Sequence, residues 1–276
     1  ETYGVLTGIT GEEERTEAAP GLPLDGGQVA GPRALSASER RLWFLCQVEP
    51  TSPVYHLAGG ARIDGPLDAL ALEAGLRAIQ ARHAALRTRF AATGDGVGAV
   101  VDSGPSVHLE RMIARGETTG AREEDARDQF TEIARAPMDL ENGPLFRALL
   151  FPVDVERHML FVLAHHLIAD GQSLEIIGRE LHLAYEAERT GRAATLPALA
   201  CSLASYVEWE AELRSGRRFD AGLAEQRKRL RGAPQVLSLP ADAPRPPVHT
   251  SAGHTETFEI GAELTARLKA IARVAE

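Results

Sequence analysis

The order of apolar and polar residues along the chain predicts a mixture of strands and helices. Two apolar runs joined by a short turn, residues 144–154 and 157–166, are typical of an antiparallel pair of strands. Apolar residues that recur every three or four positions predict helices. We expect further strands over 54–63, 96–102 and 254–260, and helices over 37–49, 67–90, 121–136, 173–189, 203–216, 223–234 and 263–275. This mixture predicts an α/β fold in which a mixed β-sheet is flanked by helices.

Two of the predicted helices begin with recognisable signals. Ser36 and Glu39 have the spacing of a capping box, in which each side chain binds a free backbone amide of the other residue. Pro66 stands where proline favours the first turn of the long helix over 67–90. The face of that helix that we expect to be buried carries Leu67, Leu70, Ala74 and Leu76.

The N-terminal stretch differs from the rest of the chain. Residues 1–33 are rich in glycine, proline, glutamate and threonine and show no sustained period, which predicts a linker or leader. The sequence begins with Glu1 instead of methionine, so we expect it to be a piece of a longer protein. No internal repeat is evident.

Composition and charge narrow the classes of function. Of the 276 residues, 44% are hydrophobic and 25% are charged, as in an ordinary globular protein. The net charge of −9 gives no broad basic field, so neither nucleic acid nor a membrane is an expected partner. No stretch reaches the roughly 18 apolar residues of a membrane span. Cys46 and Cys201 lie far apart in predicted helices and form neither a disulfide framework nor a zinc site, which favours a reducing, cytoplasmic setting.

Polar residues gather where the second apolar run ends. The stretch LAHHLIADGQS places His165, His166, Asp170 and Gly171 directly after a predicted strand. Neighbouring residues of a strand point to opposite faces, so one imidazole faces the fold. The other lies at the mouth of the strand, where substrates reach an α/β scaffold.

A helix is expected to start just beyond these residues. Ser173 is placed to cap a helix that begins at Leu174, with Glu175 in its first turn. The free amides of a helix N-terminus can stabilise a developing negative charge. Acyl transfer needs at least a group that orients or deprotonates the nucleophile and donors that stabilise the oxyanion. The histidine and the helix start, joined by the turn, can supply both.

Simpler interpretations of each residue remain open. A strand histidine is often a packing residue, Asp170 can bind turn amides, and Gly171 can supply a positive φ. A zinc site is a further alternative, although adjacent strand histidines diverge and both cysteines are distant. A serine hydrolase has less support, because the sequence contains no Gly-x-Ser-x-Gly elbow.

The complete string resembles a known signature. His165-His166-Leu-Ile-Ala-Asp170-Gly171 is similar to the HHxxxDG motif of the condensation domains of nonribosomal peptide synthetases, which belong to the chloramphenicol acetyltransferase-like superfamily. Residues 36–45 resemble the opening motif of that family, SxAQxRLWFL, and residues 82–90 resemble its second motif, RHExLRTxF. Residues 206–209 resemble the YxxW core of the fourth motif, and LRGAPQVLSLPADAPRP resembles the stretch leading to a second lobe.

The resemblance implies a fold, a domain layout and an activity. It implies that residues 34–248 form the N-terminal lobe of a chloramphenicol acetyltransferase-like fold, and that 249–276 begin a C-terminal lobe whose remainder is absent. Family members join a carrier-bound aminoacyl or peptidyl thioester to the amine of a carrier-bound aminoacyl thioester. The implied partners are upstream and downstream peptidyl carrier proteins and an adjacent adenylation domain. The phosphopantetheine arms belong to the carriers, and no cofactor or metal is expected on the chain itself.

The same resemblance implies roles for the signature residues. His166 would orient or deprotonate the attacking amine, and Gly171 would present its amide at the reacting centre. His165 would pack and orient. Asp170 would hold the loop by a salt bridge to an arginine, which can lie in the other lobe.

Arginines of the second motif would support the site from a distance. Arg82 and Arg87 are expected to tie loops and not to touch substrate. The sequence departs from the family at Ser38, Glu39 and Ala84, where Ala, Gln and Glu are usual, and the last change puts one supporting contact in doubt.

Three further expectations follow from the resemblance. The piece alone lacks half of the tunnel between the lobes, so we expect it to be inactive. A scaffold member that only recruits partner proteins is an alternative, although an intact signature favours catalysis. An ester-forming or epimerising relative would share the signature and remains open.

Overall fold

A computed structural model describes residues 31–93, 96–237, 240, 256 and 258–275. The chain divides into two compact units, residues 1–235 and 236–276, and each is described by itself. The boundary expected after residue 248 lies outside the described residues.

The larger sheet of the first unit contains the strand that ends in the histidine pair. Its order is β2-β7-β6-β5. The predicted antiparallel pair is confirmed as β6 (Phe146–Asp154) and β7 (Arg157–His165), and β2 (His56–Asp64) pairs antiparallel with the other edge of β7. Because β5 (Leu109–Arg111) runs parallel to β6, the sheet is mixed, as the sequence predicts.

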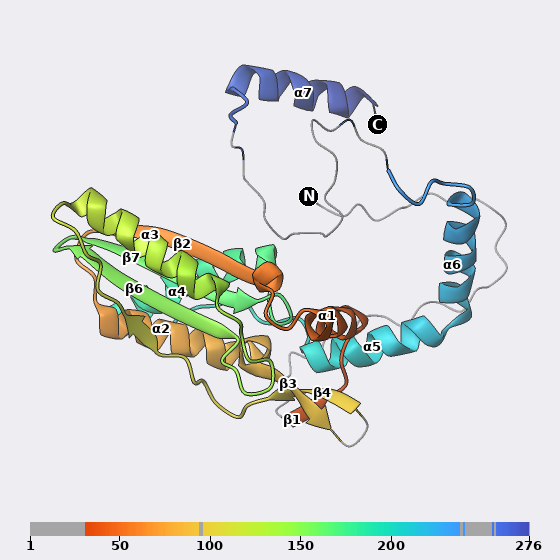
Figure 1. The fold of residues 1–276 in the computed structure, drawn as a ribbon, viewed down its shortest axis with the longest axis horizontal. Helices are drawn as coiled ribbons and strands as arrows, with labels where there is room; N and C mark the ends of the chain where they lie inside the picture. The colour runs from red at the N-terminus through yellow and green to blue at the C-terminus, as the bar shows by residue number, and fades with distance from the viewer. Residues whose placement is uncertain (1–30, 94–95, 238–239, 241–255, 257, 276) are drawn as a thin grey trace. The chain divides into compact units, whose positions relative to one another are not determined.

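Helices cover both faces of this sheet. On one face, α2 (Ala69–Arg82) and α4 (Gly171–Thr190) bury a core that includes Leu76, Ile177 and Leu181. On the other face, α3 (Thr119–Arg135) packs Phe130 against Phe161, with ring centroids 4.4 Å apart. Alternate residues of β6 and β7 supply the two cores, which explains why these strands are apolar throughout. Figure 1 shows the sheet between α3 and the α2–α4 pair.

A second, three-stranded sheet has the order β1-β4-β3. It consists of β1 (Gly31–Arg33), β4 (Gly96–Val101) and β3 (Thr88–Thr93). The linker predicted over residues 1–33 therefore overlaps an ordered strand at its last three residues. Those residues are ordered because β1 pairs with β4 and because Arg33 forms a bidentate ion pair with Glu39, with the shorter N–O distance 2.6 Å.

The helix α1 (Ala37–Val48) starts with the predicted capping box. The amide of Glu39 donates to the Ser36 hydroxyl at 3.1 Å, and the amide of Ser36 donates to Glu39 Oε2 at 2.8 Å. Glu210 of α5 (Leu203–Ser215) accepts from the Ala37 amide at 2.8 Å. The start of α1 is therefore held by its own cap and by α5, and α6 (Arg217–Arg229) follows α5 directly.

The long helix predicted over 67–90 is shorter than expected. It begins after Asp68, whose carboxylate accepts from the amides of Leu70 and Ala71, and ends at Arg82. A 3-10 turn, η2 (Ala84–Arg87), and β3 occupy the rest of the range. The predicted face is confirmed at Leu76, which is buried, and was wrong at Leu70, which is 73% exposed. Leu72 and Ile79 are buried as well. A second 3-10 turn, η1 (Pro53–Tyr55), precedes β2.

The second unit contains α7 (Ala262–Ala275), close to the predicted helix over 263–275. The strand expected over 254–260 is not present in the described part of that range, residues 256 and 258–260. A strand needs a partner strand for its backbone groups, and the described residues offer none there. In the described part of the chain, no helix has the length and apolar character needed to cross a membrane.

Candidate active site

The site is built where β7 ends and α4 begins. Because side chains alternate along a strand, β7 sends the ring of His165 into the fold, where the residue is 3% exposed. His166 is the first residue beyond the strand and is only half-buried. Its backbone amide donates to the Tyr55 carbonyl at 2.7 Å, which anchors the histidine to the residue before β2.

The ring of His165 is held as a neutral imidazole. Its Nδ1 accepts from the Leu167 amide at 3.1 Å, so the proton of the neutral ring lies on Nε2. Nε2 is 3.8 Å from the Cys46 sulfur, and the ring of His56 lies edge-on at a centroid distance of 5.6 Å. Burial, followed by the charges that His56 and His166 can carry, lowers the pKa of His165 from 6.5 to about 4.

This pKa makes stability depend on pH. Between pH 6.5 and 4 the unfolded chain binds a proton at His165 that the folded chain does not, so the free energy of unfolding falls as the pH falls through that window. The loss should approach about 3 kcal/mol by pH 4. In His165→Asn, which keeps an acceptor for the Leu167 amide, urea titrations between pH 7 and pH 4 should show a shallower decline. An identical pH dependence in both proteins would contradict the buried, neutral ring.

The ring of His166 is accessible and close to the start of α4. Among the described residues, neither of its ring nitrogens has a hydrogen-bond partner, and neither is buried without one. Its charge contributes to lowering the pKa of both His165 and Asp170, so the ring lies near both residues. An imidazole in this position is free to bind a substrate amine.

Asp170, and not Ser173, is the N-cap of α4. The helix begins at Gly171, three residues before the predicted start. Asp170 Oδ1 accepts from the Ser173 amide at 2.8 Å and from its hydroxyl at 2.7 Å, and Ser173 Oγ accepts from the Asp170 amide at 3.1 Å. Both residue types cap helices, and here the carboxylate takes the cap while serine closes the capping box from the third helical position.

The same contacts set the charge of Asp170. Hydrogen bonds from Ser173 lower the pKa of this carboxyl below its usual value, and His166 contributes in the same direction. Among the described residues no arginine or lysine forms an ion pair with Asp170, so the salt bridge implied by the family resemblance stays a prediction.

Asp170→Ala should destabilise the protein by about 1 kcal/mol, because it removes the cap of α4. Asp170→Asn keeps an acceptor for the Ser173 amide and should recover most of that loss. Thermal unfolding of the three proteins checks the prediction, and an unchanged melting temperature in Asp170→Ala would show that the cap carries no stability.

Gly171 has no conformational or steric reason to be glycine within the described structure. Its φ is not positive, and a Cβ built on it would meet no atom within 4 Å. In the described part of the chain, the amides of Gly171 and Gln172 have no acceptor. Two free donors and an open backbone therefore face whatever approaches the N-terminus of α4.

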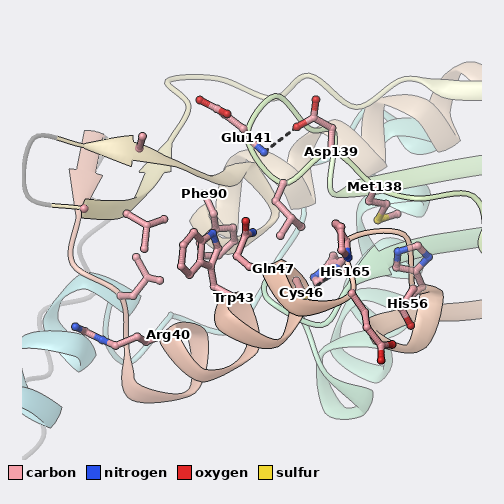
Figure 2. Close-up of a pocket in the computed structure, with 18 residues that line it drawn as sticks. Arg40, Trp43, Cys46, Gln47, His56, Phe90, Met138, Asp139, Glu141 and His165 are labelled. Atoms are coloured by element: carbon pink, nitrogen blue, oxygen red, sulfur yellow. Dashed lines mark hydrogen bonds between the residues drawn. The ribbon is translucent and has the colours of Figure 1, made fainter. Parts of the chain in front are cut away.

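A cavity of about 660 Å³ reaches His165. Figure 2 shows His56 and His165 toward one end of it and Trp43 and Phe90 toward the other. Cys46 of α1 also contributes to its wall, whereas His166 does not line it. His165 therefore faces this cavity, and His166, Gly171 and Gln172 do not contribute to its lining.

The two arginines of the second motif form hydrogen bonds that connect elements near the site. The first, Arg82, connects the end of α2 with α4. Arg82 donates to Glu180 of α4 at 3.1 Å and to the Pro197 carbonyl, and His83 lies 2.7 Å from the same carboxylate. These contacts fasten α4, whose N-terminus carries Gly171, to the end of α2.

Arg87 acts on the backbone around η2. It donates to the carbonyls of Gln80 at 2.9 Å, Ala81 at 3.3 Å and Asp102. The hydrogen bonds described here for Arg82 and Arg87 go to Glu180 and to backbone carbonyls.

Sequence reasoning missed the neighbours of His165. His56 donates from Nδ1 to the Ala134 carbonyl at 2.7 Å and stands opposite His165 in the β2–β7 register. Cys46 comes from α1, 119 residues away. Cys46 directly follows the opening motif, and His56 lies in the stretch EPTSPVYHL, which also resembles the family. The sequence assigns neither residue to the site, and strand pairing and helix packing bring them there. The described residues contain no cluster of three or more metal-binding side chains, so the zinc alternative gains no support.

Comparisons with known proteins show the family of the chain. A family model described as Condensation domain matches residues 29–275. Phosphinothricin tripeptide synthetase PhsC of Streptomyces viridochromogenes is 36% identical over 88% of this chain and 22% of its own length. The dimodular nonribosomal peptide synthase of Bacillus subtilis is 35% identical over 87% of this chain and 10% of its own length.

Solved structures show the same fold. The X-domain, solved in a complex with OxyB from teicoplanin biosynthesis, is 30% identical with a TM-score of 0.68, over 83% of this chain and 50% of that one. The starter condensation domain of rhizomide synthetase RzmA is 23% identical with a TM-score of 0.67, over 75% of this chain and 49% of that one. The chain thus spans about half of these structures and less than a quarter of the two synthetases. It belongs to the condensation-domain family of nonribosomal peptide synthetases.

Proposed function

We propose that this chain supplies the histidine side of a site that forms peptide bonds. The donor is an aminoacyl or peptidyl thioester and the acceptor is the amine of an aminoacyl thioester, each on the phosphopantetheine arm of a carrier-protein domain. The observation that carries the proposal is the accessible ring of His166 beside the free amides of Gly171 and Gln172, at a glycine that nothing inside the fold requires.

Each residue has a definite task in this reaction. The acceptor amine attacks the thioester carbonyl, a C–N bond forms, and negative charge develops on the carbonyl oxygen. His166 orients the amine or takes its proton, and the Gly171 amide donates to the oxyanion. The C–S bond then breaks and the leaving sulfur takes up a proton. Because aminolysis of a thioester is downhill, holding amine and carbonyl in contact contributes much of the rate.

The remaining parts of the site come from outside the described residues. The structural relatives are about twice as long as the part that matches this chain. We therefore infer that a second lobe closes the site over His166 and that the 276-residue chain alone forms no product. The partners are upstream and downstream carrier proteins and an adjacent adenylation domain, in a cytoplasmic synthetase.

The test uses two loaded carrier proteins and mass spectrometry of the product. The chain extended to the length of the relatives should form the peptide bond, and the 276-residue chain should not. A productive isolated chain would overturn the two-lobe site, and an extended chain with no product would overturn the function.

Protein recruitment is a second candidate function. One observation favours it: the X-domain, which is similar to this chain, was solved in a complex with another protein, OxyB. An extended chain that binds its carriers but forms no product, with or without His166, would support recruitment over condensation.

A further inference from the structure

Helix α6 and its flanks concentrate positive charge in a negatively charged chain. Between residues 214 and 231 the sequence has seven of its 30 lysines and arginines and only two acidic residues, whereas the whole chain has a net charge of −9. All seven basic side chains are exposed, and none forms an ion pair with a described residue. They are Arg214, Arg217, Arg218, Arg227, Lys228, Arg229 and Arg231. Arg214 lies over the ring of Phe219, but no described carboxylate neutralises the charge of this segment.

An apolar groove lies beside these charges. It has a volume of about 570 Å³ and is formed mainly by apolar residues, with two polar ones at its wall. They are Trp209 and Leu213 of α5 and Arg218, Phe219, Gly222, Leu223 and Gln226 of α6. Gly222 leaves room in it, because a Cβ at this position would meet no atom within 4 Å. No residue of α6 is buried. A helix of 13 residues is marginally stable by itself, so a partner that covers its apolar side would stabilise it.

The apolar and basic side chains along α6 indicate which kind of partner would fit the groove. Helical spacing places Phe219, Leu223 and Leu230 on one stripe, and Leu230 is 66% exposed at the helix end. Arg218 and Arg229 fall on one side of this stripe and Arg227 on the other. Apolar side chains with cations on both sides fit a second amphipathic helix whose apolar residues have carboxylates on both sides.

The geometry favours such a helix over a lipid surface or a nucleic acid. Phe219 and Leu223 line a concave groove shared with α5, so they do not present the flat, free apolar face that inserts into a membrane. The guanidinium of Arg214 lies 5.1 Å from the centroid of the Phe219 ring, which leaves that face unavailable for stacking with a base. The net charge of −9 also opposes association with long polyanions.

We propose that the groove between α5 and α6 is a docking surface for an acidic helix of another protein domain. Apolar side chains of that helix enter the groove, and its carboxylates pair with Arg218, Arg227 and Arg229. The proposal goes beyond the proposed function and does not depend on His166, so either can fail without the other.

The test is a binding titration with a defined probe. The probe is a fluorescein-labelled helical peptide with a leucine stripe and glutamates on both flanks, and its comparison peptide carries glutamines in place of the glutamates. Fluorescence anisotropy should show that the acidic peptide binds the chain at least about tenfold more tightly than the glutamine peptide. Binding should weaken as salt is raised from about 50 to about 300 mM, because the charges are exposed.

Two pairs of variants locate the binding site. The double variant Arg218→Glu, Arg229→Glu should weaken binding by about tenfold or more, whereas Arg77→Glu, Arg179→Glu changes the net charge equally on α2 and α4 and should leave it within about twofold. Melting curves of all proteins show whether the fold is intact.

The second pair tests the groove by filling it. Gly222→Leu should weaken binding by about fivefold or more, and the matched control Gly178→Leu, on an exposed and equally open position of α4, should not. Both substitutions favour a helix, so neither should unfold the chain.

Three results would overturn the proposal. The first is equal binding of the acidic and glutamine peptides. The second is binding of duplex DNA or phosphatidylserine vesicles that is tighter than that of the peptide and is lost in the same variants. The third is loss of peptide binding when the chain is extended to the length of its structural relatives, which would assign the groove to a contact within the domain.

Discussion

Replacement of His166 by alanine is expected to lower the rate of peptide-bond formation by about 10²-fold or more in the chain extended to full domain length. The ring of His166 is half-buried and has no hydrogen-bond partner among the described residues, so its removal takes away substrate contacts and no internal support. Single-turnover assays with two loaded carrier proteins measure the effect.

The companion variants separate a proton acceptor from a positioning group. His166→Gln keeps a hydrogen-bonding side chain but cannot take up a proton at neutral pH. A rate close to that of the wild type in the glutamine variant would assign positioning to His166, and a rate as low as that of the alanine variant would assign proton transfer. Equal turnover of His166→Ala and wild type would remove the residue from the reaction.

Replacement of Gly171 by leucine should also abolish most of the activity while leaving the fold intact. A Cβ at this position meets no atom of the described residues within 4 Å, and leucine favours a helix more than glycine does. The only expected effect is to cover the free amide at the start of α4, and denying one oxyanion donor costs about 10²-fold in rate. Product formation and melting temperature together check this prediction.

The matched control is Gly178→Leu, which lies in the same helix, is exposed and is equally free of neighbours. It should retain the activity of the wild type. If Gly171→Leu were fully active, the N-terminus of α4 would not contact the reacting carbonyl. If it melted well below the control, glycine would be needed for a reason inside the fold.

The parts of the fold that carry strong local signals could be predicted from the sequence. Two features were predicted correctly: the capping box of Ser36 and Glu39, and the strand pair β6–β7. The first is a fixed spacing of two residue types, and the second is a pair of apolar runs joined by a short turn. The prediction of one helix over 67–90 was wrong beyond Arg82, where α2 ends. Its first half has apolar residues all around, so spacing alone does not choose a face, and tertiary pairing with β4 turns Thr88–Thr93 into a strand.

The site was predictable only as far as the signature extends. Alternation along a strand separates His165 from His166, and the structure shows which of the two is buried. The prediction that Ser173 caps α4 was wrong. Aspartate and serine both favour the N-cap position, so the sequence does not choose between Asp170 and Ser173, and the structure shows that Asp170 is the cap. The positions of His56 and Cys46 beside His165, and the cavity that they line, result from contacts between segments that are distant in sequence. No local sequence pattern predicts such contacts.

We expect the reaction to take place at His166 and Gly171, and not in the cavity that His165 faces. A crystal structure of the full-length domain with a stable amide analogue of the donor thioester and a bound acceptor amine tests it most directly. We expect the amine nitrogen to lie about 2.6–3.2 Å from a ring nitrogen of His166 and the carbonyl oxygen to lie within hydrogen-bond distance of the Gly171 amide. An analogue whose carbonyl and amine lie against His165 and Cys46, with the ring of His166 remote from both, would contradict it.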